Sequence, residues 1–271
     1  MPTLVLSRRF SEDSNSMWRA AIAAGWSVER LMSYRVPEGL AERDPVLYGE
    51  TLLIDAVSHD LGLELLEPDY GWLPRLKHEY RQREIVAMDL DAARKLPEDR
   101  FVKPVDEKLF RSQVYAPGEL AGVSQGLADT TAVLVSEVVE WQLEVRTFIH
   151  ERRVVTLSAY LRDGELAQDA QGEWPLSDLE RAEASQLLER MLADADVELP
   201  PALVLDVGRL RRGRDGLWQW AVVEANPAWA SGLCGCDPDQ VLALLRAVNL
   251  RASEVPLNLT AWARSKHERT W

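Results

Sequence analysis

Two apolar segments near the C-terminus, separated by a polar stretch with two glycines, constrain the fold more than any other part of the sequence. Residues 203–207 (Leu-Val-Leu-Asp-Val) and 222–226 (Val-Val-Glu-Ala-Asn) each have the composition of a buried strand. Residues 211–216 between them (Arg-Arg-Gly-Arg-Asp-Gly) have the composition of a turn. The pattern predicts an antiparallel β-hairpin.

The register of this hairpin determines which polar side chains meet. If residues 214–216 form a three-residue loop with Gly216 in the left-handed conformation, Asp206 lies directly opposite Glu224. Opposed residues share a sheet face, and Asn226 shares it two positions further on. Two carboxylates and an amide oxygen suit Mg²⁺, a hard cation that binds oxygen ligands. The alternative is a hairpin whose polar face is simply solvated.

Further segments occur in an order that resembles the ATP-grasp superfamily. Residues 101–104 (Phe-Val-Lys-Pro) form a short strand that ends in Lys103, and residues 132–141 form an apolar strand that runs into a hinge. The triplet Glu-Val-Arg at 144–146 and the closing Glu-Ala-Asn-Pro at 224–227 look most like the RimK-type amino-acid ligases within the superfamily.

Three segments narrow this resemblance. Residues 46–49 (Val-Leu-Tyr-Gly), residues 72–74 (Trp-Leu-Pro), and Lys103 followed by Lys108 resemble a poorly characterised clade of bacteria and phages marked by one arginine and two lysines. The resemblance covers roughly residues 45–245. It implies an α/β and α+β architecture: a small N-terminal α/β domain (1–75), a small ATP-grasp lobe (76–135) and a large lobe with the metal site (136–271).

The resemblance also implies a role for each candidate residue. Phosphate would be bound by Lys103, Lys108 and Arg146, adenine by the backbone of Glu137, Val138 and Val139, the ribose hydroxyls by Glu144, and Mg²⁺ by Asp206, Glu224 and Asn226. Lys103 and Arg146 would also stabilise transferred phosphate.

Each of these roles has a plainer alternative. Glu144 and Arg146 project to one side of their strand and could form a solvated ion pair, while Lys103 could be an exposed lysine at a strand end. Val138 and Val139 could be core residues. Arg162 follows a strand and could meet phosphate or a substrate carboxylate, or lie on the surface, and the role of Arg111 is open.

Composition restricts the classes of partner. The chain has 31 Lys and Arg against 44 Asp and Glu, a net charge of −13, which disfavours nucleic-acid and anionic-membrane surfaces because both require a basic footprint. No apolar run approaches the roughly 20 residues that span a bilayer, and the N-terminus is unlike a signal peptide. A cytoplasmic location is therefore expected. Cys234 and Cys236 are too close for an ordinary disulfide.

Local patterns predict the elements of each part. Strands are expected at 3–6, 28–31, 45–49 and 63–68 with helices at 17–24 and 52–61, which together make a small parallel α/β layer. Residues 69–74 are the best linker candidate. Strands at 84–88 and 101–103, loop and turn over 106–125, and meandering strands over 131–163 follow. Helices are expected at 176–192, with Ser177 and Glu180 as a capping box, at 238–248 and around Trp262.

The function implied by the resemblance is ATP-dependent ligation of a carboxylate to an amine through an acylphosphate. ATP and Mg²⁺ are the expected cofactors, and the substrate could be a small molecule, a peptide or a protein. A catalytically silent ATP-binding regulatory or scaffold protein is the alternative. A third possibility, an α/β interaction protein without a nucleotide, follows if the hairpin register is wrong.

Overall fold

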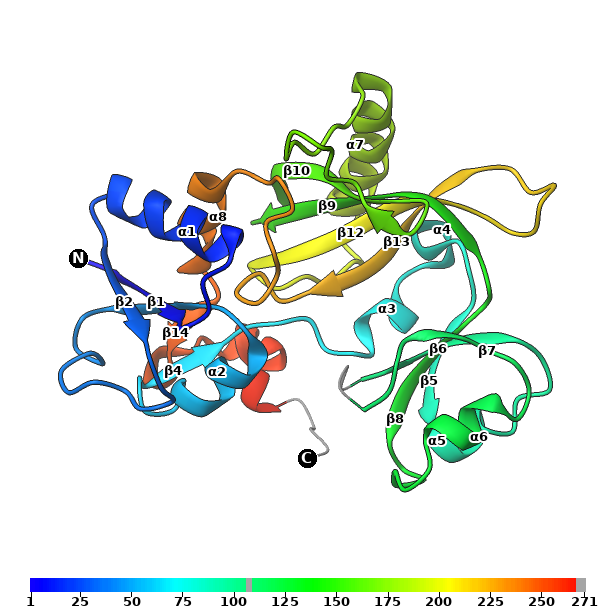
Figure 1. Cartoon of the computed structure of the whole chain (residues 1–271), viewed down its shortest axis with the longest axis horizontal. Helices are drawn as coiled ribbons and strands as arrows, with labels where there is room; N and C mark the ends of the chain where they lie inside the picture. The colour runs from blue at the N-terminus through cyan, green and yellow to red at the C-terminus, as the bar shows by residue number, and fades with distance from the viewer. Residues whose placement is uncertain (106–108, 267–271) are drawn as a thin grey trace.

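Residues 1–105 and 109–266 are described by the computed structural model, which contains three main sheets and one two-stranded ladder (Figure 1). The first sheet is parallel, in the order β2-β1-β3, and confirms the predicted N-terminal α/β layer. Its central strand is apolar because both faces are covered. The elements are β1 (Thr3–Ser7), α1 (Glu12–Ala23), β2 (Ser27–Leu31), β3 (Pro45–Tyr48) and α2 (Thr51–Val57).

The predicted fourth strand is present but does not join this sheet. β4 (Leu63–Leu65) pairs antiparallel with β14 (Asn249–Arg251), so a segment from the far end of the chain packs against the first part. The helix expected around Trp262 is a 3-10 helix. The elements of this returning segment are α8 (Pro238–Leu245), η1 (Ala252–Glu254), η2 (Leu257–Trp262) and η3 (Arg264–Lys266). The division at 1–75, 76–135 and 136–271 remains a prediction, to which this pairing adds a link between the two outer parts.

Two short helices, α3 (Trp72–Arg75) and α4 (His78–Arg81), lead into an antiparallel sheet in the order β5-β8-β6-β7. The expected linker at 69–74 is partly ordered, since the side chains of Trp72 and Leu73 are buried. The stretch expected as loop contains β7 and α6. The elements are β5 (Ile85–Asp89), α5 (Leu90–Ala93), β6 (Arg100–Pro104), β7 (Gln113–Tyr115), α6 (Glu119–Val123) and β8 (Ala132–Ser136). We call this part the small lobe.

The third sheet, which we call the large sheet, is antiparallel in the order β11-β10-β9-β12-β13. The expected meander over 131–163 is therefore wrong for β8, which pairs with β5 and β6 of the small lobe. α7 begins with the predicted capping box, in which both Ser177 and Glu180 make the reciprocal hydrogen bonds. The elements are β9 (Glu140–His150), β10 (Arg153–Arg162), β11 (Glu165–Leu166), α7 (Asp178–Ala193), β12 (Ala202–Arg211) and β13 (Gln219–Asn226).

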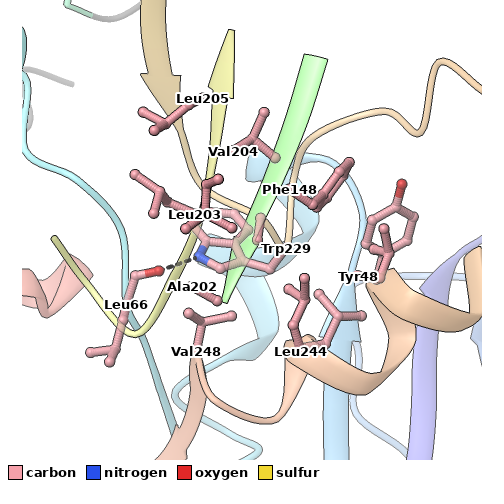
Figure 2. Close-up of a cluster of buried hydrophobic side chains, with 14 of the residues drawn as sticks. Tyr48, Leu66, Phe148, Ala202, Leu203, Val204, Leu205, Trp229, Leu244 and Val248 are labelled. Atoms are coloured by element: carbon pink, nitrogen blue, oxygen red, sulfur yellow. Dashed lines mark hydrogen bonds between the residues drawn. The ribbon is translucent and has the colours of Figure 1, made fainter. Parts of the chain in front are cut away.

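The described residues form two separate hydrophobic cores. One core runs continuously from the first sheet through the large sheet to α8, and the other lies within the small lobe. Trp229 is fully buried at the centre of the larger core, where Figure 2 shows it between strands of the large sheet, Tyr48, Leu66 and α8. Its indole N–H donates to the Leu66 carbonyl at 3.0 Å. The first part and the large sheet are therefore one packed unit.

No helix among the described residues is long and apolar enough to cross a membrane.

Candidate functional site

The β12–β13 hairpin brings Asp206 directly opposite Glu224, as the sequence predicted. The expected three-residue loop is wrong, however: β12 ends at Arg211, β13 begins at Gln219, and Gly213 rather than Gly216 has a positive φ, of 62°. Near the loop the pairing is shifted by one position relative to the prediction. An irregularity in the ladder beyond Val207 and Val222 corrects the shift. Two errors in the predicted register therefore cancel at the site.

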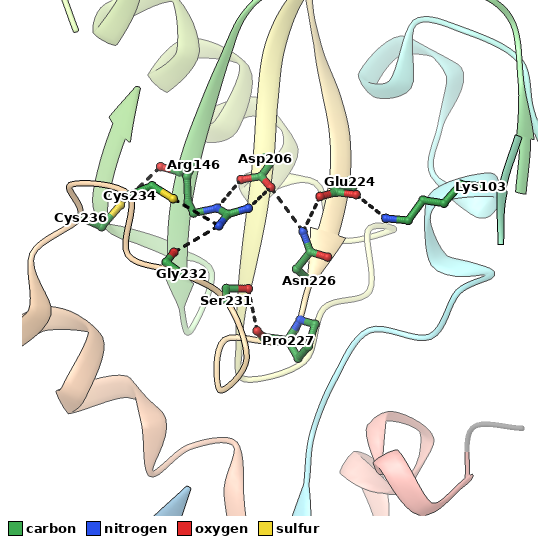
Figure 3. Close-up of polar contacts among 10 residues, drawn as sticks. All are labelled: Lys103, Arg146, Asp206, Glu224, Asn226, Pro227, Ser231, Gly232, Cys234 and Cys236. Atoms are coloured by element: carbon green, nitrogen blue, oxygen red, sulfur yellow. Dashed lines mark hydrogen bonds and ion pairs between the residues drawn. The ribbon is translucent and has the colours of Figure 1, made fainter. Parts of the chain in front are cut away.

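Asp206, Glu224 and Asn226 converge on one face of the large sheet (Figure 3). The Asn226 amide donates to Glu224 Oε1 at 2.8 Å and to Asp206 Oδ2 at 3.3 Å. Asp206 is completely buried, and the other two are partly exposed. This arrangement excludes the alternative in which the hairpin presents these side chains only to water.

A cation is attached to each carboxylate. Arg146 makes a bidentate ion pair with Asp206, with Nε–Oδ1 at 3.0 Å and Nη2–Oδ2 at 2.8 Å, and its guanidinium lies 4.1 Å from the ring centroid of Tyr160. Lys103 reaches from the small lobe to Glu224, with Nζ–Oε2 at 2.6 Å. The site therefore gathers two anions and two cations from the small lobe and the large sheet.

Burial and neighbouring charge shift the carboxyl groups in opposite directions. Burial, with Asp206 and Glu224 nearby, raises the pKa of Glu144 to about 8, so this side chain is mostly neutral at pH 7. Burial also raises the pKa of Asp206 to about 6, against the opposing effect of Arg146. Burial opposes ionisation of Glu224 too, but Lys103 and Asn226 outweigh it and lower its pKa to about 2.

The proposed hinge joins the two sheets. Residues 137–139 run between β8 and β9 without regular structure. The Glu137 N–H donates to the Glu84 carbonyl at 3.1 Å, and its side chain accepts from the Glu84 N–H at 2.8 Å. Val138 is 43% exposed, so it is not a core residue. Lys108 lies outside the described residues.

Two other interpretations are settled by side-chain partners. Arg146 pairs with Asp206 inside the protein and not with Glu144 at the surface. Arg162 pairs with Glu180 on α7 at 2.8 Å, so it braces a helix and is not aimed at the other candidate residues. Trp220 was expected by parity to share the face of Glu224, but its indole donates to Glu183 on α7 because the irregular pairing changes the parity.

Arg83 and Asp13 lie beside the site, although neither belongs to a motif that would single it out. Arg83 is 5% exposed and donates to the backbone of β13. Asp13, from the first turn of α1, accepts from the Leu233 N–H at 3.1 Å, next to the loop whose Gly232 carbonyl accepts from Arg146 at 3.2 Å. Burial raises the pKa of Asp13. Both contacts join residues distant in sequence, and a linear pattern contains no signal for them.

The donor atoms fit a hard divalent cation. Carboxylate and amide oxygens are the ligands that Mg²⁺ takes when it shares its coordination shell with phosphate. Within the described ranges, no cluster of three or more His, Cys, Asp or Glu side chains could hold a metal. Any metal at this site therefore depends on the mixed set of two carboxylates and one amide.

Comparison with solved structures identifies the fold. The chain is similar to a D-alanine–D-alanine ligase from Bacillus anthracis, with 11% identity, a TM-score of 0.52 and coverage of 90% of this chain and 96% of that chain. The same enzyme solved with ATP gives 14% identity, a TM-score of 0.51 and the same coverage, 90% and 96%. A RimK-domain ATP-grasp protein from Sphaerobacter thermophilus gives 14% identity and a TM-score of 0.48 over 90% and 99% of the two chains.

The fold is thus that of the ATP-grasp proteins, which confirms the expected fold class. A family model matches residues 80–244, and it describes the ATP-grasp domain of family 2 in the clade marked by one arginine and two lysines. The chain belongs to this family. The RimK-like resemblance inferred from the motifs is thereby confirmed. No curated protein matches the sequence.

Proposed function

We propose that this protein is an ATP- and Mg²⁺-dependent ligase that joins a carboxylate to an amine. The observation that carries the proposal is the convergence of Asp206, Glu224 and Asn226 on one face, with Arg146 and Lys103 bound to the two carboxylates. Phosphoryl transfer requires positioning and neutralisation of charge more than it requires a protein nucleophile. Oxygen ligands and two cations at one place supply both.

Each residue has a defined task in this proposal. Asp206, Glu224 and Asn226 would hold Mg²⁺, which when bound would neutralise phosphate charge. Lys103 and Arg146 already lie at these carboxylates and would turn to phosphate oxygens. The backbone of residues 137–139 would hold adenine, and Glu144 would accept the ribose hydroxyls. Lys108 is proposed for phosphate by family resemblance alone.

The proposed reaction has two steps. An oxygen of the substrate carboxylate attacks the γ-phosphorus of ATP, a new O–P bond forms, and the bond to the β-phosphate oxygen breaks, which releases ADP. The amine nitrogen of the second substrate then attacks the acylphosphate carbon, an amide forms, and inorganic phosphate leaves with the electron pair of the broken C–O bond. Arg146 and Lys103 would stabilise the negative charge on the transferred group.

The experiment has a binding arm and a turnover arm. Mg·ATP should raise the thermal unfolding temperature of the wild-type protein, and ADP should be released in the presence of a productive carboxylate and amine. Glu224→Gln keeps the shape of the side chain but removes its charge, so the rate of ADP release should fall roughly a thousandfold or more while part of the ATP affinity survives.

The matched control is Glu183→Gln on α7, whose side chain accepts from Trp220 and can still do so as an amide. This variant should release ADP at the wild-type rate. Absence of any Mg·ATP-dependent stabilisation of the wild-type protein would contradict the proposed function. Wild-type turnover in Glu224→Gln would remove Glu224 from the mechanism.

A further inference from the structure

The side chain of Glu224 reaches the site face only because the β12–β13 ladder contains an extra residue. From Leu210–Gln219 to Val207–Val222 the pairing is regular, and continued regularly it would place Val223 opposite Asp206. Glu224 would then point to the opposite face of the sheet. The observed pairing of Asp206 with Glu224 leaves Val223 as the extra residue of a β-bulge. The geometry of this bulge therefore sets the position of Glu224.

Arg83 binds the backbone of this bulge. Its Nη1 donates to the Val222 carbonyl at 2.7 Å and its Nη2 to the Val223 carbonyl at 2.8 Å. β13 is the last strand of the large sheet, so no further strand binds its outer edge. The guanidinium takes the place of that strand, and its planar fork fixes two successive peptide groups at once.

The guanidinium is itself held from several sides. Arg83 Nη1 also donates to the Arg81 carbonyl at 3.0 Å, and Arg81 Nη1 donates back to the Arg83 carbonyl at 2.8 Å. The Trp141 ring lies 5.0 Å from the guanidinium carbon. That ring lies across Gly208, where a Cβ would come within 2.9 Å of it. A backbone loop, an aromatic face and a glycine together fix the orientation of Arg83.

We propose that Arg83 is a positioning residue, which holds the bulge in the conformation that aims Glu224 at the metal. The inference rests on the proposed function, because the position of Glu224 matters only if it binds the cation. Arg83 touches neither reacting atom nor metal ligand directly, and it acts through the Val222 and Val223 peptide groups. Support of this kind typically changes metal affinity about ten- to hundredfold when it is removed.

The test compares Arg83→Met and Arg83→Lys with a matched control, Arg152→Met. Arg152 also donates to three backbone carbonyls, those of Leu192, Asp194 and Val197, but it lies at the β9–β10 turn, away from the site residues. The probe is Mg²⁺, titrated against thermal stability in the presence of an ATP analogue whose γ-phosphate cannot be transferred. Affinity for the same analogue is measured separately in EDTA.

Arg83→Met should raise the Mg²⁺ concentration for half-maximal stabilisation about ten- to hundredfold, with affinity in EDTA changed by less than about twofold. Arg83→Lys should fall between Arg83→Met and the wild type, because a single ammonium group cannot bind both carbonyls in the same geometry. Arg152→Met should lower the unfolding temperature without changing the Mg²⁺ requirement.

A wild-type Mg²⁺ requirement in folded Arg83→Met would overturn the inference, as would an equal change in Arg152→Met. Should Arg83→Met fail to fold, Arg83→Lys decides the question in the same way. Failure of the proposed function looks different, because the wild-type protein would then show no Mg²⁺-dependent stabilisation with the analogue.

Discussion

At the scale of single residues, the site is organised by ion pairs that the sequence could not specify. The residue types of Asp206, Glu224 and Asn226 and their hairpin spacing were enough to predict that these side chains would meet. The partners of the carboxylates, Arg146 and Lys103, come from other strands and, for Lys103, from a different lobe. Partner choice of this kind depends on tertiary packing, and a motif gives residue identity only.

Lys103 is expected to contribute more to binding than to stability. Lys103→Met should weaken ATP affinity about ten- to hundredfold, the equivalent of one charge-assisted hydrogen bond. Its ion pair with Glu224 is partly exposed, so the free energy of unfolding should change by less than about 1 kcal/mol. Calorimetric titration with Mg·ATP and urea unfolding measure the two effects. Lys95→Met, which removes an exposed pair with Asp91 on the same lobe, is the control, and equal ATP affinity in the two variants would contradict the phosphate role.

Glu144 predicts a specific pH dependence of stability. Its pKa rises from 4.5 in the unfolded chain to about 8 in the folded protein, so the folded state retains a proton that the unfolded state loses. This contribution to stability is complete below about pH 4.5, declines as the pH rises and is lost above about pH 8. Glu144→Gln should therefore be more stable than wild type at pH 8, by on the order of 1–3 kcal/mol, with little difference at pH 4.5.

Urea unfolding of both proteins at the two pH values measures this difference. A stability difference between Glu144→Gln and wild type that stays constant from pH 4.5 to pH 8 would show that Glu144 ionises normally in the folded protein.

At the scale of elements, the sequence predicted what depends on local pattern and missed what depends on pairing. The first parallel sheet and the capping box of α7 follow from apolar runs and from a Ser-x-x-Glu spacing. The partner of β4 and the bulge at Val223 carry no local signal. The register at Asp206 was predicted correctly because the assumed short loop and the missing bulge compensate each other.

Gly208 in β12 provides a test of packing at the element scale. A Cβ at this position would lie 2.6 Å from the Leu143 carbonyl and 2.9 Å from the Trp141 ring, so backbone or ring must move. Gly208→Ala should cost about 1–3 kcal/mol of unfolding free energy. Gly122→Ala in α6 is the control, since its Cβ would meet no atom within 4 Å and alanine favours a helix. Chemical denaturation measures both, and equal effects would show that β12 has room for a side chain.

At the scale of the whole molecule, two cores of unequal extent predict unequal local stability. The small lobe has its own compact cluster around Leu90, Val102 and Val133, whereas the larger core joins the first part, the large sheet and α8. All ten tryptophans lie outside residues 85–135, so indole fluorescence does not report on the small lobe. Sub-global opening of the small lobe should therefore occur at a lower free energy than global unfolding.

Native-state hydrogen exchange measures this difference directly. Amides of β6 and β8 should exchange through a lower-energy opening than those of β9 and β12, and Mg·ATP should reduce the difference, since it would bind Lys103 and the large sheet together. Identical exchange free energies for the four strands would show that the two cores unfold as one.

The pairing of β4 with β14 also has a consequence during synthesis. Leu63–Leu65 leaves the ribosome long before Asn249–Arg251 has been made, and at ordinary translation rates the delay is roughly ten to forty seconds. During this time β4 has no strand partner, and the Leu66 carbonyl lacks the indole of Trp229. The nascent chain therefore carries an incomplete first domain through most of its translation. The part of the protein that is made first is among the last to be finished.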